Sequence, residues 1–150
     1  MESILTSIKK MLGIAEEYTQ FDADIIMHIN SVFTTLTQLG VGPSEGFYIE
    51  NETTEWTDFI YDPVKLQSVK SYMYLRVRIL FDPTSLGSAT LAAYERQIQE
   101  FEWRLNIAAE ADVTQNALAN GIRLTDKTRK TTHRLYVDNS KLVIEEETQR

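Results

Sequence analysis

The sequence contains no cysteine, and its 150 residues include only six glycines and three prolines. The absence of cysteine excludes disulfide bridges, thiol nucleophiles and thiolate metal sites. No apolar run approaches the roughly 18 uncharged residues of a membrane span, and the chain begins with an acid where a secretion signal has bases. We therefore expect a soluble protein of intracellular origin that does not engage a membrane.

The composition is that of a globular protein, with 43% hydrophobic and 25% charged residues and a net charge of −7. This length suits one domain of about 100–200 residues, or a smaller domain with an appendage. The charge is uneven, because residues 1–110 carry −8 and residues 111–150 carry +1. Such asymmetry indicates either a partner contacted by the tail or a solvated strand face of alternating charge.

The first 107 residues have the spacing of helices. Apolar side chains three and four positions apart predict helices over 2–12, from Asp22 to Gly40, from Pro63 to Asp82, and from Ser88 to about 107. Asp22 and Asp62 are expected as N-caps, and Gly13 and Gly40 as the residues that end their helices. The third of these helices is apolar over a wide arc, which is typical of a central helix.

The segment 40–62 is predicted as a loop with one helical turn near 55–60. Its aromatic residues, Trp56, Phe59 and Tyr61, are expected to attach the loop to the body. In the fourth helix, Trp103 lies on the polar side. It either folds into the subunit or marks a contact between molecules.

The tail changes to a period of two. Residues 108–121 are small and polar, and we expect a linker or a frayed extension of the helix. Alternating apolar residues then predict two or three short antiparallel strands within 122–147, with a turn at 138–140. The expected fold class is mainly α, a four-helix body with a C-terminal β-hairpin or small β-meander arm. A lone hairpin is marginally stable in water, so it must lie on its own body, a sister subunit or a partner.

The residues offer no catalytic constellation. His28 and His133 are far apart in sequence, and neither has a partner at metal-ligand or general-base spacing. The glycine-rich run 40–46 lacks the Lys-Ser/Thr pair and the preceding strand of a phosphate loop. Glu95 and Glu102 are two turns apart on a helix surface and are expected to be solvated. No enzyme activity, metal or cofactor is therefore expected.

The order of elements resembles the head–tail connector (adaptor) proteins of tailed bacteriophages. The stretches that carry the resemblance are 21–40, the loop 42–47, and 69–83, within which 72–83 (YMYLRVRILFDP) is the most specific. The resemblance ends with residues 101–105 and spans about residues 1–107. The expected organisation is thus a connector-like body (1–107), a linker (108–121) and a hairpin arm (122–147) that looks like an addition.

The resemblance implies a structural protein of the virion at the head–tail interface, assembled in the host cytoplasm. It implies a homo-oligomeric ring of about a dozen copies, which needs two different contact patches on each subunit. One side of the ring would bind the portal protein and the other a neck, stopper or tail-completion protein. DNA would pass through the middle without specific binding, and the acidic body suits such a conduit.

The tail and Trp103 are the candidate contacts with the portal or a neighbouring subunit. The proposed set is Arg123, Arg129, Lys130, Arg134, Leu135, Tyr136, Val137 and Trp103. The alternative hypothesis is a small nucleic-acid-binding regulatory protein that uses the basic stretch 123–134.

Overall fold

The computed structural model describes residues 2–125, 132–138 and 141–147. The helices are α1 (Ile4–Leu12), α2 (Asp22–Gln38), α3 (Trp56–Phe59), α4 (Pro63–Phe81), the 3-10 turn η1 (Pro83–Ser85) and α5 (Ser88–Asn120). The strands are β1 (Ile122–Thr125), β2 (Thr132–Asp138) and β3 (Lys141–Glu147). The chain divides into two compact units, Met1–Ile107 and Ala108–Arg150. The predicted fold class is confirmed.

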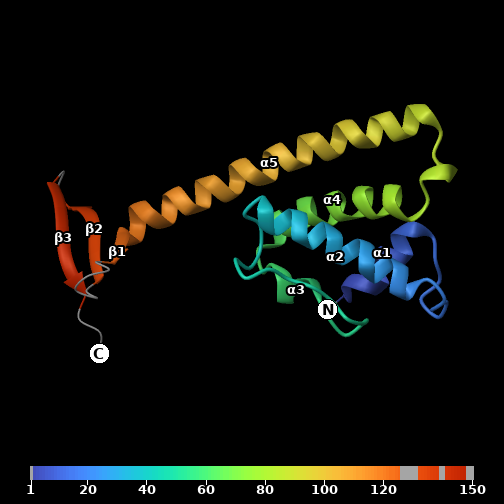
Figure 1. The fold of residues 1–150 in the computed structure, drawn as a ribbon, viewed down its shortest axis with the longest axis horizontal. Coiled ribbons are helices and arrows are strands. Elements are labelled where there is room, and N and C mark those ends of the chain that lie inside the picture. Colours follow the sequence, from blue (N-terminus) through green and yellow to red (C-terminus); the bar gives the residue numbers. More distant parts are fainter. Residues whose placement is uncertain (1, 126–131, 139–140, 148–150) are drawn as a thin grey trace. The chain divides into compact units, whose positions relative to one another are not determined.

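Helix α4 is the centre of the first unit, as its wide apolar arc predicts. It packs against both α1 and α2, and α2 runs beside it in Figure 1. Tyr72 and Met73 of α4 are completely buried, as are Ile29 and Phe33 of α2 and Ile8 of α1. These side chains form one continuous hydrophobic core, whose burial is the main stabilising contribution to the unit.

The helix ends follow their local chemistry, with one exception. The Asp62 carboxylate accepts hydrogen bonds from the backbone N–H groups of Val64, at 2.8 Å, and Lys65, at 3.2 Å, so it caps α4 as predicted. The predicted cap at Asp22 is wrong, because Asp22 is already the first residue of α2. Its carboxylate lies 2.7 Å from the ammonium of Lys9 instead. Because Lys9 is buried, leaving its charge without a counter-ion would cost more free energy than leaving the helix without a side-chain cap.

The long loop before α4 is fixed by side-chain hydrogen bonds. The Asn30 amide donates to the Ile49 carbonyl at 2.9 Å and accepts from the Ile49 N–H at 2.8 Å. The indole N–H of Trp56 donates to the Ser7 hydroxyl at 2.7 Å, which joins α3 to α1. Trp56 is buried, as expected, but Tyr61 is exposed and does not attach the loop to the body.

A cluster of three aromatic rings packs the loop against α2. The ring centroids of Phe33 and Phe59 are 4.7 Å apart, and Phe47 lies 4.9 Å from Phe33. Gly42 passes directly over Phe59 with a φ of +87°. A Cβ atom at this position would lie 2.2 Å from the Phe59 ring, so the close approach requires glycine.

The segment 108–121 continues the helix. Helix α5 runs without interruption to Asn120, which agrees with an extension of the helix. Alanine, the strongest helix former, recurs through this segment and explains the continuity. Gly121 then takes a φ of +75°, in the left-handed region, and the first strand begins at the next residue.

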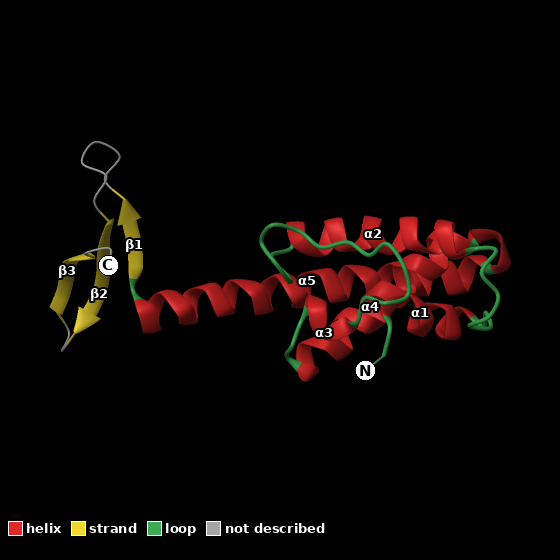
Figure 2. Ribbon diagram, turned by 90° about the horizontal axis from the view of Figure 1, so that it is seen from below, coloured by secondary structure: helices red, strands yellow, loops and turns green. Residues whose placement is uncertain are grey.

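The second unit carries a three-stranded antiparallel meander in the order β1-β2-β3, with β2 in the centre (Figure 2). Ile122 pairs with Leu135, and Leu135 pairs in turn with Ile144. A Cβ on Gly121 would lie 2.5 Å from the Leu135 carbonyl oxygen, so the helix-to-strand junction approaches β2 closely. The predicted turn at 138–140 lies largely outside the described residues.

Substituting Gly42 tests the packing of the aromatic cluster. Gly42→Ala and Gly46→Ala both place a side chain at positive φ, but only Gly42 faces an atom within 4 Å. We expect both variants to lose about 1 kcal/mol from backbone strain, and Gly42→Ala to lose a further 1–3 kcal/mol, roughly, from overpacking against Phe59. Urea unfolding of the two variants measures the difference. Equal losses of unfolding free energy in the two variants would contradict the close approach of Gly42 to the Phe59 ring.

Candidate binding surfaces

The sheet has one apolar face. Residues paired across strands point to the same side, and alternate residues along a strand share a face. The apolar face therefore carries Leu135 at its centre with Ile122 and Ile144 on either side. Leu124 and Leu142 extend it along β1 and β3. Beside Leu124 the face becomes polar, because His133 pairs with Leu124 on one side and with Glu146 on the other. Four side chains of this face are largely exposed: Ile122 by 51%, Leu124 by 50%, Leu142 by 68% and Ile144 by 65%. A contiguous exposed apolar surface of this kind marks a site of interaction.

The opposite face of the sheet is polar and internally connected. The Tyr136 hydroxyl donates a hydrogen bond to the Glu145 carboxylate at 2.6 Å, and this bond raises the pKa of Tyr136. The Arg134 guanidinium lies 5.2 Å from the centre of the Tyr136 ring, a cation–π distance. Arg134 also stands directly opposite Glu145 in the register. The basic character of β2 is therefore balanced by an acid on the neighbouring strand.

The register separates the residues that the sequence groups together in the tail. Leu135 lies on the apolar face, whereas Arg134 and Tyr136 lie on the polar face. Arg123 and Val137 have backbone partners in the sheet, Arg134 and Leu142 respectively. Arg129 and Lys130 lie outside the described residues. The described members of the predicted set thus belong to two surfaces and not to one.

Trp103 forms a second candidate surface, on α5. Of the described side chains of α5, only Ile98 and Leu105 are buried. Trp103 comes five residues after Ile98, about 140° further around the helix. It is 66% exposed, and Ile107, one turn later, is 47% exposed. Of the two alternatives for Trp103, the structure agrees with a side chain that points away from the subunit.

Two grooves lie along the contact between α4 and α5. The first has a volume of about 630 Å³ and mainly aromatic and aliphatic walls with polar side chains among them. Its lining residues are Met11, Gln67, Lys70, Ser71, Tyr74, Leu75, Tyr94, Gln97, Glu100, Phe101 and Arg104. The second, of about 540 Å³, is lined by Arg76, Ile79, Leu80, Glu95, Ile98, Gln99 and Glu102. These grooves follow from the few buried contacts that α5 makes.

A polar network joins α5 to α4 beside the second groove. The Glu102 carboxylate accepts a hydrogen bond from the Tyr72 hydroxyl at 2.8 Å and lies 3.7 Å from the Arg76 guanidinium. The expectation that Glu102 is simply solvated is therefore wrong. Burial, and after it this hydrogen bond, raise the pKa of Tyr72 far above its ordinary value, because both favour the neutral hydroxyl over the phenolate.

The titratable residues elsewhere form no further site within the described ranges. His28 is half-buried on α2, and His133 stands on β2 opposite Glu146. Among the described residues, no three His, Asp or Glu side chains gather closely enough to hold a metal ion. None of the described helices combines the length and the apolar character needed to cross a bilayer.

A family model described as "Phage connector protein" matches residues 4–112, well over half of the chain. The chain belongs to the phage connector protein family. The predicted resemblance is confirmed, and the match supports a structural connector role in a bacteriophage. Comparisons with curated proteins and with solved structures give no match. The family match ends before β1, so the connector's sheet lies outside it.

Four apolar residues of the sheet, Ile122, Leu124, Leu142 and Ile144, were visible in the sequence but were not selected as site residues. The alternation of Ile122 with Leu124 and of Leu142 with Ile144 predicts strands. Only the register shows that they share a face with Leu135. The grooves beside α5 could not be found from periodicity, which predicts an inner face but not how completely that face is covered.

The Tyr72–Glu102 bond makes the connector's stability sensitive to alkaline pH. Unfolded tyrosine ionises near pH 10, whereas the raised pKa keeps Tyr72 protonated in the folded chain. The unfolded state therefore holds fewer protons above pH 10, and the free energy of unfolding falls by up to about 1.4 kcal/mol per pH unit for this group. Tyr72→Phe should remove that contribution between pH 10 and 11.5, whereas Tyr61→Phe, at an exposed residue, should not. If denaturant unfolding gives Tyr72→Phe and the unchanged chain the same dependence of the free energy of unfolding on pH, the assignment is contradicted.

Proposed function

We propose that this connector forms a closed ring on the portal vertex of the phage head, and that the apolar face of its sheet binds the portal protein or a neighbouring subunit. DNA passes through the ring. A neck, stopper or tail-completion protein binds the other side. The protein takes its place in the virion at the head–tail interface, after assembly in the host cytoplasm.

The observation that carries the proposal is the exposed apolar face of the sheet. Four of its side chains are at least half exposed. Full burial of an exposed side chain of this size contributes about 1.5–3 kcal/mol, so burying the exposed part of each would contribute roughly half of that or more. A binding partner supplies that burial, and β1 and β3 are the edge strands of the sheet that the described residues form, where a partner strand can pair. Leu135 belongs to this face. Arg134 and Tyr136 line the polar face, where they set orientation on a charged partner.

The remaining residues of the sequence-based set retain a proposed role in the same contact. They are Arg123, Arg129, Lys130 and Val137 in the tail, with Trp103 on α5 as the patch for a neighbouring subunit. In this proposal residues 1–107 act as the ring-forming body, 108–121 as the connection, and 122–147 as the clasping arm. A ring of about a dozen copies needs two different patches on each subunit.

The charge distribution supports a passage for DNA more than a site that binds it. Residues 1–110 carry a net charge of −8, and affinity for duplex DNA arises mainly from the neutralisation of phosphates. The one basic stretch is partly neutralised by its own sheet, because Arg134 stands opposite Glu145. The alternative function, a nucleic-acid-binding regulator, is therefore the less well supported.

Binding to duplex DNA separates the two functions. The free connector should show no saturable binding to a fluorescently labelled 30-base-pair duplex at 100 mM salt, since its charge is unfavourable. Fluorescence anisotropy measures this directly. Tight binding that weakens steeply between 50 and 200 mM salt would instead favour the regulator.

Variants on β3 test the role of the apolar face. Leu142→Thr combined with Ile144→Thr makes this part of the face polar and places β-branched residues, which suit a strand, at both positions. We expect binding to portal particles of the same phage to weaken at least tenfold, because two apolar anchors are lost. Surface plasmon resonance with immobilised portal particles gives the affinity.

Val143→Thr is the matched control, since Val143 lies between the two residues on the opposite face of the same strand. It should leave portal binding within about twofold of the unchanged chain. Circular dichroism confirms that both variants keep their secondary structure. Equal affinity of the double variant and the unchanged chain would rule out the apolar face as the portal contact.

A further inference from the structure

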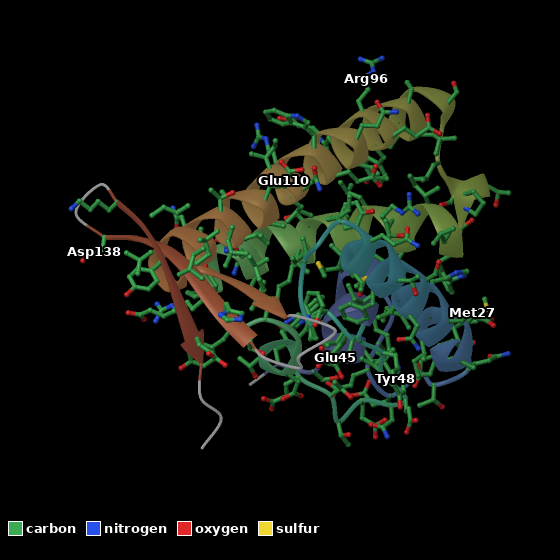
Figure 3. All side chains as sticks on the ribbon, turned by 60° about the vertical axis from the view of Figure 1, so that its left-hand side comes forward. Met27, Glu45, Tyr48, Arg96, Glu110 and Asp138 are labelled. Atoms are coloured by element: carbon green, nitrogen blue, oxygen red, sulfur yellow. The ribbon has the colours of Figure 1, made fainter. Side chains whose placement is uncertain are left out.

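Helix α5 bears two different apolar surfaces in the first unit. The exposed pair Trp103 and Ile107 projects from one side, while the 630 Å³ groove against α4 lies on another. Figure 3 shows Arg96 of α5 pointing away from the other helices. Trp103 follows Arg96 by seven residues, about two turns, and so lies on the same side of α5. The projecting pair and the groove therefore do not meet within one copy.

We propose that Trp103 and Ile107 of one connector copy insert into the α4–α5 groove of a second copy. The contact joins two different surfaces, so it is heterologous and leaves one free groove and one free Trp103 at the ends of every pair. It can therefore repeat from copy to copy. This inference rests on the proposed ring and identifies the body residues that hold neighbouring subunits together.

The chemistry of the groove suits an indole. Its walls include Met11, Tyr94 and Phe101, and a thioether sulfur and aromatic rings both make favourable contacts with tryptophan. Lys70 and Arg104 contribute cations to the same lining, and tryptophan is the best acceptor of cation–π interactions. Lys70 already lies 5.4 Å from the centre of the Trp56 ring in its own chain.

The dimensions of the two surfaces are also compatible. A tryptophan side chain buries about 150–250 Å² on insertion, and the groove volume of about 630 Å³ leaves room for Ile107 beside it. Met11 at the groove is itself 40% exposed, so the receiving surface, like the projecting pair, leaves apolar area uncovered in one copy. Insertion covers both.

The second groove is the less suitable receptor. Its lining includes Arg76, Glu95 and Glu102, of which Arg76 and Glu102 already pair with each other. Insertion of an indole there would remove water from these charges without supplying a polar partner, which is costly. The first groove also holds charged residues, Lys70, Glu100 and Arg104. Two of these three are cations that can face an indole, whereas two of the three in the second groove are carboxylates, which cannot.

Because the chain contains no cysteine, single introduced cysteines can report the contact in the free protein. Ser71→Cys places a thiol in the groove, and Ile107→Cys places one beside Trp103. An equimolar mixture of the two variants at high concentration should form disulfide-linked heterodimers under mild oxidation. In the control mixtures, Ser31→Cys, at an exposed residue of α2, takes the place of Ser71→Cys or of Ile107→Cys. The doubly substituted chain should form a ladder of linked copies.

Adding Trp103→Ala to the Ile107→Cys variant should reduce cross-linking to Ser71→Cys about 30-fold, the loss typical of an interface hot spot. Predominant Ile107→Cys homodimers would show a symmetric contact and overturn the proposal, as would cross-linking no stronger than with Ser31→Cys. The readout uses the free chain and no portal. Failure here therefore leaves portal binding by the sheet intact, and loss of portal binding in the β3 variants leaves this contact intact.

Discussion

A β-sheet with one apolar face must cover that face, because hydrocarbon exposed to water is the largest unfavourable contribution that a small sheet can carry. In this connector the constraint falls on three short strands at the end of a 33-residue helix. Ile122, Leu142 and Ile144 are all at least half exposed. A three-stranded meander with this surface is suited to association, and its stability and its function depend on the same burial.

The helical body, in contrast to the sheet, already buries its apolar side chains in a core of its own. Its core is closed by α1, α2 and α4, with Tyr72 and Phe33 completely buried, and its loop is fixed by Asn30 and Trp56. Helix α5 adds little to that core, since Ile98 and Leu105 are its buried residues among those described. Because α5 buries few side chains against a closed core, grooves and exposed side chains remain along it. An assembly protein can bind neighbouring subunits through such surfaces.

Much of the fold could be predicted from the sequence, because local chemistry decided it. Asp62 before Pro63 and Gly13 after α1 fixed helix ends, and the period-two pattern after 121 predicted strands. The errors arose where tertiary contacts took precedence over local preferences. Asp22 pairs with the buried Lys9 instead of capping its helix, and Glu102 bonds to Tyr72 instead of facing water. The candidate site divided for the same reason, because strand register is a non-local property.

Electron microscopy of portal particles mixed with the connector tests the central claim most directly. If the connector is an assembly part bound through its sheet, reconstructions should show a collar of added density on the portal, with the three-stranded sheet buried against the portal or an adjacent connector copy. Portal particles without added density, or a collar in which the apolar face of the sheet remains open to solvent, would contradict the account.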